Sequence, residues 1–209
     1  NLEYIKKIIN EVKHKSLMIA QTPHTFSGIE VALLDLLGKK EQSPIYSLLG
    51  YEKTTPKIAY ASVLFGKTPQ ETFNIGKLIK EKNFRAIKFG WQNFGKNFQL
   101  DEEHLIAARE AIGQELHLMV DVGAIWGTNV EEAVKRNNIF NNAKITWLEE
   151  PFYSDAFFEY NELYKKTNLP LAGGESCHST ESAKNMIRFG KVKFIQIDAG
   201  IAGGILAGK

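Results

Sequence analysis

The sequence lacks the features that would place it in a membrane or in a disulfide-stabilised fold. It has one cysteine, Cys177, among 209 residues, so an internal disulfide framework is excluded. Its five histidines are scattered, and no zinc-type cluster of cysteine and histidine is visible. No run of about 18 apolar residues is present, which argues against a transmembrane helix. We therefore expect a cytoplasmic protein in a reducing compartment, with no membrane partner.

An excess of charge of either sign is also missing. The 26 Lys and Arg residues and 24 Asp and Glu residues give a net charge of +2. This is too small to predict binding to nucleic acid. Glycine-rich phosphate-binding motifs are absent as well, because "IAGGILAGK" (201–209) fits neither G-x-G-x-x-G nor G-x-x-x-x-G-K-[ST]. A phosphate-binding α/β enzyme with an open sheet is therefore the weaker alternative.

What the sequence does contain is a regular alternation of predicted strands and helices. Apolar residues recur at helical spacing through the first 50 residues. From there on, short apolar runs predict strands at 57–63, 83–90, 116–122, 144–150, 169–175 and 192–199. Such alternation indicates a parallel α/β fold, either an open sheet or a barrel. Six strand–helix units are two fewer than a closed barrel needs.

Capping residues predict where several helices begin. Thr68 and Thr128 are each followed three residues later by a glutamate, the pattern of a capping box. Asp101 precedes another amphipathic segment and is predicted to cap that helix.

Acidic residues recur where the predicted strands end. The separations are 28, 26 and 23 residues, each about one strand–helix unit, for Asp121, Glu149, Glu175 and Asp198. In a barrel such strand ends converge on one rim, where active sites lie, and Lys88 joins them there. Clustered anions need a positive partner, and oxygen ligands without cysteine or histidine suit Mg²⁺. For each acid alone, a helix cap or a solvated loop position is the alternative.

Several motifs together resemble a known family. In order and spacing, "FRAIKFG", "LMVDVG", "WLEEPF", "LAGGES" and "IQIDAGIAGGI" are similar to barrel strands two to six of the mandelate racemase/muconate lactonizing enzyme group of the enolase superfamily. The resemblance implies a modified TIM (β/α) barrel, incomplete here with about six strands. Residues 54–209 would form barrel strands one to six, without strands seven and eight. Residues 1–53 would be the helical C-terminal part of an α+β capping domain.

The resemblance also assigns roles to individual residues. Lys88 matches the first lysine of a Lys-x-Lys motif, which implies a catalytic and substrate-binding role. Asp198 matches the acid that pairs with a catalytic histidine of the seventh strand. His178 lies close to a predicted ligand and is expected to reach substrate, with a solvated loop histidine as the alternative. The resemblance implies that Mg²⁺ is bound by Asp121, Glu149 and Glu175.

This sequence departs from the family pattern at three points. Gly90 replaces the second lysine of Lys-x-Lys, so no base is expected on that side of the substrate. Gly123 replaces an asparagine that often follows the first metal ligand by two residues. The histidine expected on the seventh strand is not in this sequence.

These features predict an enzyme that removes the proton next to a carboxylate. Mg²⁺ and a nearby cation would stabilise the enolate. The expected reaction is dehydration of a sugar acid, a small-molecule carboxylate, by a lyase. A racemase, epimerase or cycloisomerase of the same superfamily is the first alternative, and a non-catalytic binding or structural module is the second. We further expect a homo-oligomer, between a dimer and an octamer.

Overall fold

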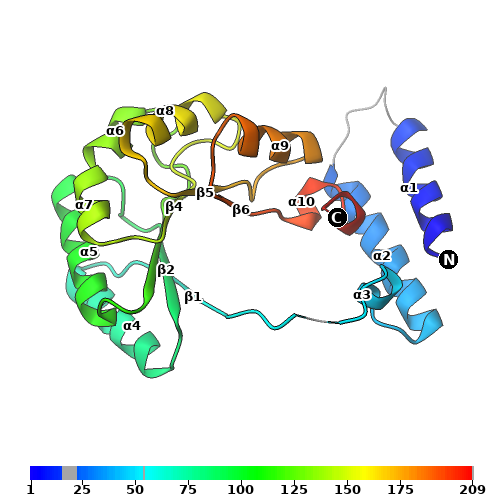
Figure 1. Ribbon diagram of the computed structural model, residues 1–209, viewed down its shortest axis with the longest axis horizontal. Coiled ribbons are helices and arrows are strands. Elements are labelled where there is room, and N and C mark those ends of the chain that lie inside the picture. Colours follow the sequence, from blue (N-terminus) through cyan, green and yellow to red (C-terminus); the bar gives the residue numbers. More distant parts are fainter. Residues whose placement is uncertain (16–22, 54, 209) are drawn as a thin grey trace. The chain divides into compact units, whose positions relative to one another are not determined.

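The computed structural model describes residues 1–15, 23–53 and 55–208, which form two compact units (Figure 1). The first unit contains Asn1–Lys57, Glu175–Lys184 and Ile197–Lys209. The second unit contains Ile58–Gly174 and Asn185–Gln196. The predicted domain boundary between residues 53 and 54 falls next to a residue outside the described ranges, and it stays a prediction.

Helices make up the first unit. They are α1 (Leu2–Lys15), α2 (Pro23–Glu41), α3 (Ile45–Leu48), α10 (Ala199–Ala202) and α11 (Ile205–Gly208). Only part of the apolar residues that predicted the long helices packs them together, since Ile29 and Leu36 of α2 are exposed. The buried core of this unit consists of Ile5, Ile9, Leu34 and Leu37.

A parallel sheet organises the second unit. Its strands are β1 (Ala61–Leu64), β2 (Ala86–Gly90), β3 (His117–Asp121), β4 (Trp147–Glu149), β5 (Leu171–Gly173) and β6 (Phe194–Ile195). Five lie inside their predicted segments and β1 extends one residue beyond its segment, so the parallel α/β fold is confirmed. The strands are hydrogen-bonded in chain order, and every neighbouring pair is parallel. In the described part of the chain β1 does not pair with β6, so the sheet is not closed.

Helices follow the strands and cover one side of the sheet (Figure 1). They are α4 (Pro69–Glu81), α5 (Phe98–Ile112), α6 (Val130–Lys135), α7 (Asn137–Asn142) and α8 (Phe157–Thr167). Helix α9 (Thr180–Arg188) begins in the first unit and ends in the second. Apolar strand residues such as Ile87, Val120 and Leu148 are fully buried. Because side chains alternate along a strand, the residues next to these in each strand face the other side of the sheet.

In the described ranges, no helix has the length and apolar character needed to cross a membrane.

Two of the three predicted helix starts need correction. The capping box at Thr68 is confirmed, since its side chain accepts a hydrogen bond from Glu71 N at 3.2 Å. The box at Thr128 is wrong. Helix α6 begins at Val130, and its N-cap Asn129 makes no side-chain capping bond. Asp101 lies inside α5, whose first turn is instead capped by Asn97.

Candidate active site

Three charged side chains meet where β2, β3 and β4 end. Asp121 and Glu149 are the last residues of their strands, and the strand register places them side by side. Gly90 at the end of β2 pairs with Asp121, so Lys88, two residues earlier, points to the same face. The exposed fractions of Lys88, Asp121 and Glu149 are 9%, 8% and 0%. These strand ends are the positions at which parallel barrels build active sites.

The Lys88 ammonium group bridges the two carboxylates. Its Nζ lies 2.5 Å from Glu149 Oε1 and 3.3 Å from Asp121 Oδ2. The other oxygen of each carboxylate also has a donor. Gly123 N donates to Asp121 Oδ1 at 3.0 Å, and Trp147 Nε1 donates to Glu149 Oε2 at 2.8 Å. Every carboxylate oxygen therefore has a polar partner, which offsets the cost of burying two like charges.

Burial and neighbouring charges shift the pKa values of Lys88 and Asp121. Burial lowers the pKa of Lys88, but the hydrogen bond to Glu149 and the two negative charges outweigh burial, so its pKa lies above the ordinary value. Burial raises the pKa of Asp121, and the neighbouring Glu149 charge raises it further against the opposing effect of Lys88. Lys88 is therefore positively charged at neutral pH and is the natural counter-ion of the pair.

Sequence reasoning missed two aromatic residues of this cluster. Trp147 precedes Glu149 by two residues, so strand alternation alone could have placed both on one face. Tyr60 contacts the same group: the Lys88 Nζ lies 5.9 Å from its ring centroid, within cation–π range. The rings of Tyr60 and Trp147 meet edge to face at 6.0 Å. Nothing in the sequence around Tyr60 indicated this contact.

The two glycines that depart from the family pattern both lie against Asp121. A Cβ atom at Gly90 would sit 3.1 Å from Asp121 Cβ, closer than ordinary packing allows. Gly123 has φ +55, a conformation that favours glycine. Its Cβ would meet Trp91 Nε1 at 3.0 Å. Larger residues at either position would press on Asp121 or on the loop beside it.

The remaining predicted site residues belong to the first unit. Asp198 Oδ1 accepts a hydrogen bond from Gly200 N at 2.6 Å and caps α10. His178 lines a cavity of about 280 Å³ together with Phe26 and neighbouring residues. Within the described ranges, no group of three or more His, Cys, Asp or Glu side chains is gathered so that it could hold a metal. The ligand set that includes Glu175 therefore stays a prediction, as do the roles of Asp198 and His178.

The donor chemistry at the strand ends nevertheless fits Mg²⁺. Asp121 and Glu149 offer carboxylate oxygens, the hard donors that Mg²⁺ prefers. Both carboxylates already converge on one positive group, the Lys88 ammonium. The pair is thus arranged to hold positive charge.

A buried ion pair holds the loops that follow β2 and β3. Arg136 Nε donates to Asp101 Oδ2 at 2.8 Å, and both side chains are almost fully buried. Gly95, in the loop after β2, donates its N–H to Asp101 Oδ1 at 2.8 Å. Its carbonyl accepts hydrogen bonds from Arg136 at 3.1 Å and from Trp126, in the loop after β3, at 2.9 Å. This network fixes both loops at the strands that carry Lys88 and Asp121.

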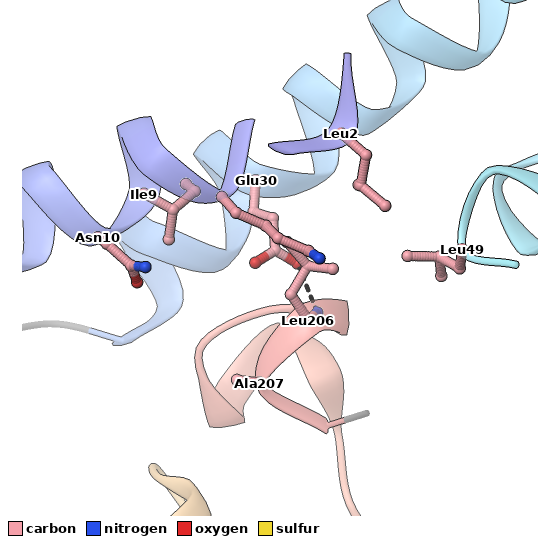
Figure 2. Close-up of a pocket in the computed structure, with 8 residues that line it drawn as sticks. Leu2, Ile9, Asn10, Glu30, Leu49, Leu206 and Ala207 are labelled. Carbon is pink, nitrogen blue, oxygen red and sulfur yellow. Dashed lines mark hydrogen bonds between the residues drawn. The ribbon is translucent and has the colours of Figure 1, made fainter. Parts of the chain in front are cut away.

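The first unit contains a cavity of about 370 Å³, with Glu30 in its wall (Figure 2). Glu30 is fully buried, and its Oε1 accepts a hydrogen bond from Leu206 N at 2.9 Å. Its Oε2 has no hydrogen-bond partner among the described residues. A Cβ at Gly204, where φ is +111, would lie 2.5 Å from the Glu30 carboxylate. Glu30 thus holds the turn between α10 and α11 against α2.

Comparison with known proteins identifies relatives over most of the chain. A sequence model of the family described as enolase C-terminal domain-like matches residues 74–209. Arabinonate dehydratase from Saccharolobus solfataricus is 29% identical over 184 residues, covering 86% of this chain and 48% of that protein. D-galactarolactone cycloisomerase from Agrobacterium fabrum is 30% identical over 182 residues, covering 85% and 47%. The chain spans about half the length of these curated relatives.

Solved structures show the same architecture. A predicted mandelate racemase from Rhodobacter sphaeroides superposes with a TM-score of 0.87 at 40% identity. The match covers 97% of this chain and 52% of that one. The names of other curated relatives include a racemase and an epimerase.

Proposed function

This chain belongs to the enolase C-terminal domain-like family, in the mandelate racemase/muconate lactonizing enzyme group, and we propose that its protein is a Mg²⁺-dependent sugar-acid dehydratase. The predicted family resemblance is thereby confirmed, and the curated relatives are enzymes. The observation that carries the proposal is the buried cluster of Lys88, Asp121 and Glu149 at the strand ends. Its groups match the needs of proton abstraction next to a carboxylate.

The reaction removes a proton from the carbon next to the substrate carboxylate and then expels hydroxide from the following carbon. The resulting enol becomes a 2-keto acid. A Mg²⁺ ion held by Asp121, Glu149 and Glu175 would supply Lewis-acid stabilisation of the developing negative charge. Lys88 adds a fixed positive charge beside the substrate carboxylate. Asp198 would orient the histidine base, which is not in this sequence.

Gly90 favours dehydration over racemisation by two bases. Racemisation of that kind needs a proton-transfer group on each face of the substrate. Glycine supplies no such group, and a larger residue would press on Asp121. Dehydration, in which one base removes the proton and hydroxide then leaves, needs a base on only one face of the substrate.

Acid sugars are the proposed substrates for two reasons. Relatives are named as dehydratases of such acids, and Lys88 carries a positive charge that suits a substrate carboxylate. Two curated relatives are named arabinonate dehydratase and L-talarate/galactarate dehydratase. Lys88 would pair with the substrate carboxylate, and His178 would contact a substrate hydroxyl. We propose a cytoplasmic setting on the basis of the single cysteine.

The test is exchange of the proton next to the carboxylate in D₂O, followed by NMR over a set of acid sugars with Mg²⁺. We expect exchange together with loss of water from at least one substrate. Asp121→Asn should abolish exchange while the protein stays folded. Asp155→Asn, which removes an exposed carboxylate, is the matched control. A racemase would instead give a deuterated epimer without loss of water.

A structural or binding module is the second candidate. It is favoured by one observation, that Lys88, Gly123 and Trp147 already satisfy both carboxylates. If the site binds metal, Mg²⁺ should raise the unfolding temperature of the protein, because a ligand that binds only the folded state stabilises it. Absence of both this stabilisation and proton exchange would contradict the dehydratase proposal and favour the module.

A further inference from the structure

We propose that Lys88 is an internal cation that competes with the divalent ion for Asp121 and Glu149. The inference rests on the proposed Mg²⁺ site and adds a switch to it. Without metal, the ammonium group neutralises the two carboxylates. With metal, the ammonium group is released and becomes available to the substrate carboxylate.

Lys88 holds the oxygens that a metal would need. Its Nζ contacts Glu149 Oε1 and Asp121 Oδ2, one oxygen from each carboxylate. Among the described residues, these are the ion pairs that Asp121 and Glu149 form with lysine or arginine. Two cations that share these oxygens repel each other, and this repulsion is strong in a poorly solvated site.

Of the side chains that donate to Glu149, Lys88 is the one that can move away. The other oxygen of Glu149 is held by Trp147, whose ring packs against Tyr60 and Phe194. An indole fixed on the same strand between two rings has little freedom to move. Lys88 reaches the carboxylates through a flexible stem with several rotatable bonds, so its ammonium group is the partner that can leave.

The released ammonium group has a place close by. The Tyr60 ring already lies 5.9 Å from Nζ, and its face attracts a cation. A substrate carboxylate entering after the metal would meet a Lys88 no longer committed to Glu149. The competition therefore predicts an order of binding, with the metal first and the acid substrate second.

The test measures metal affinity with Lys88 changed. Mg²⁺ and Mn²⁺ are titrated by calorimetry into the wild-type protein, Lys88→Met, Lys88→Arg and Lys77→Met. Lys77 is an exposed lysine of α4 and controls for loss of a positive charge. We expect Lys88→Met to bind either ion at least about tenfold more tightly, because the competing cation is gone. Lys88→Arg should stay near wild type, and Lys77→Met should not change affinity.

A second readout follows the ammonium group itself. Acylation of surface amines, read by mass spectrometry, should modify Lys88 faster when Mg²⁺ is added, while Lys77 reacts at an unchanged rate. Circular dichroism establishes that each variant is folded.

The outcomes separate this inference from the proposed function. Equal or weaker metal binding by folded Lys88→Met, with the wild type binding normally, overturns the competition and leaves the dehydratase proposal standing. Unchanged acylation of Lys88 on metal addition overturns the release step. If neither the wild type nor Lys88→Met binds metal, the proposed function fails and the inference falls with it.

Discussion

Replacing Arg136 with methionine should destabilise the second unit strongly. The substitution keeps most of the side chain's apolar bulk but removes the guanidinium, which donates to Asp101 Oδ2, the Gly95 carbonyl and Glu132. Asp101 then remains as a buried carboxylate without its cation. Breaking a buried ion pair from one side costs about 3–5 kcal/mol, so we expect the free energy of unfolding to fall by roughly this amount.

The effect is measured by urea unfolding, with Lys135→Met as the matched control. Lys135 is the adjacent residue, and its contact with Glu132 is long, 4.0 Å, between side chains that are 57% and 40% exposed. Its replacement should change stability by no more than about 0.5 kcal/mol. A loss below about 1 kcal/mol for Arg136→Met would refute the importance of the buried pair.

Hydrogen exchange tests whether the same pair holds the loops. In Arg136→Met, the Gly95 amide should exchange faster, because its acceptor Asp101 is no longer fixed. A double-variant cycle with Asp101→Asn should give a coupling energy of at least about 1 kcal/mol. Additive effects of the two substitutions would mean that the residues stabilise the unit independently.

Two further predictions concern backbone strain and pH. Gly204→Ala should cost about 3 kcal/mol in thermal or urea unfolding, because φ is +111 and the new Cβ would meet Glu30 at 2.5 Å. Gly28→Ala, on an open face of α2, should instead stabilise by up to about 1 kcal/mol, and similar costs at both sites would refute the reasoning. Burial lowers the pKa of His104, so the unfolded state binds the proton more readily and stability should fall as pH drops through 6.5. This pH dependence should be weaker in His104→Gln, and an unchanged slope would remove His104 from the explanation.

The strands were predictable because their signal is local. Each is a short apolar run between polar segments, and such runs must be buried whatever the rest of the chain does. The cap at Thr68 was equally local, since its donor lies three residues away. The same local reasoning wrongly predicted a helix cap at Asp101, because this carboxylate pairs with Arg136, which is distant in the sequence.

The amino-acid sequence by itself placed Asp121 and Glu149 at strand ends and Lys88 two residues before one, because strand alternation and the strand–helix spacing determine these positions. The tertiary structure decided which groups they meet. The parallel register of β2, β3 and β4 brings Lys88 onto both carboxylates, and it places Trp147 and Tyr60 around them. The physical reason is that periodicity along a strand specifies a direction, while a contact also requires the neighbouring strand and its register.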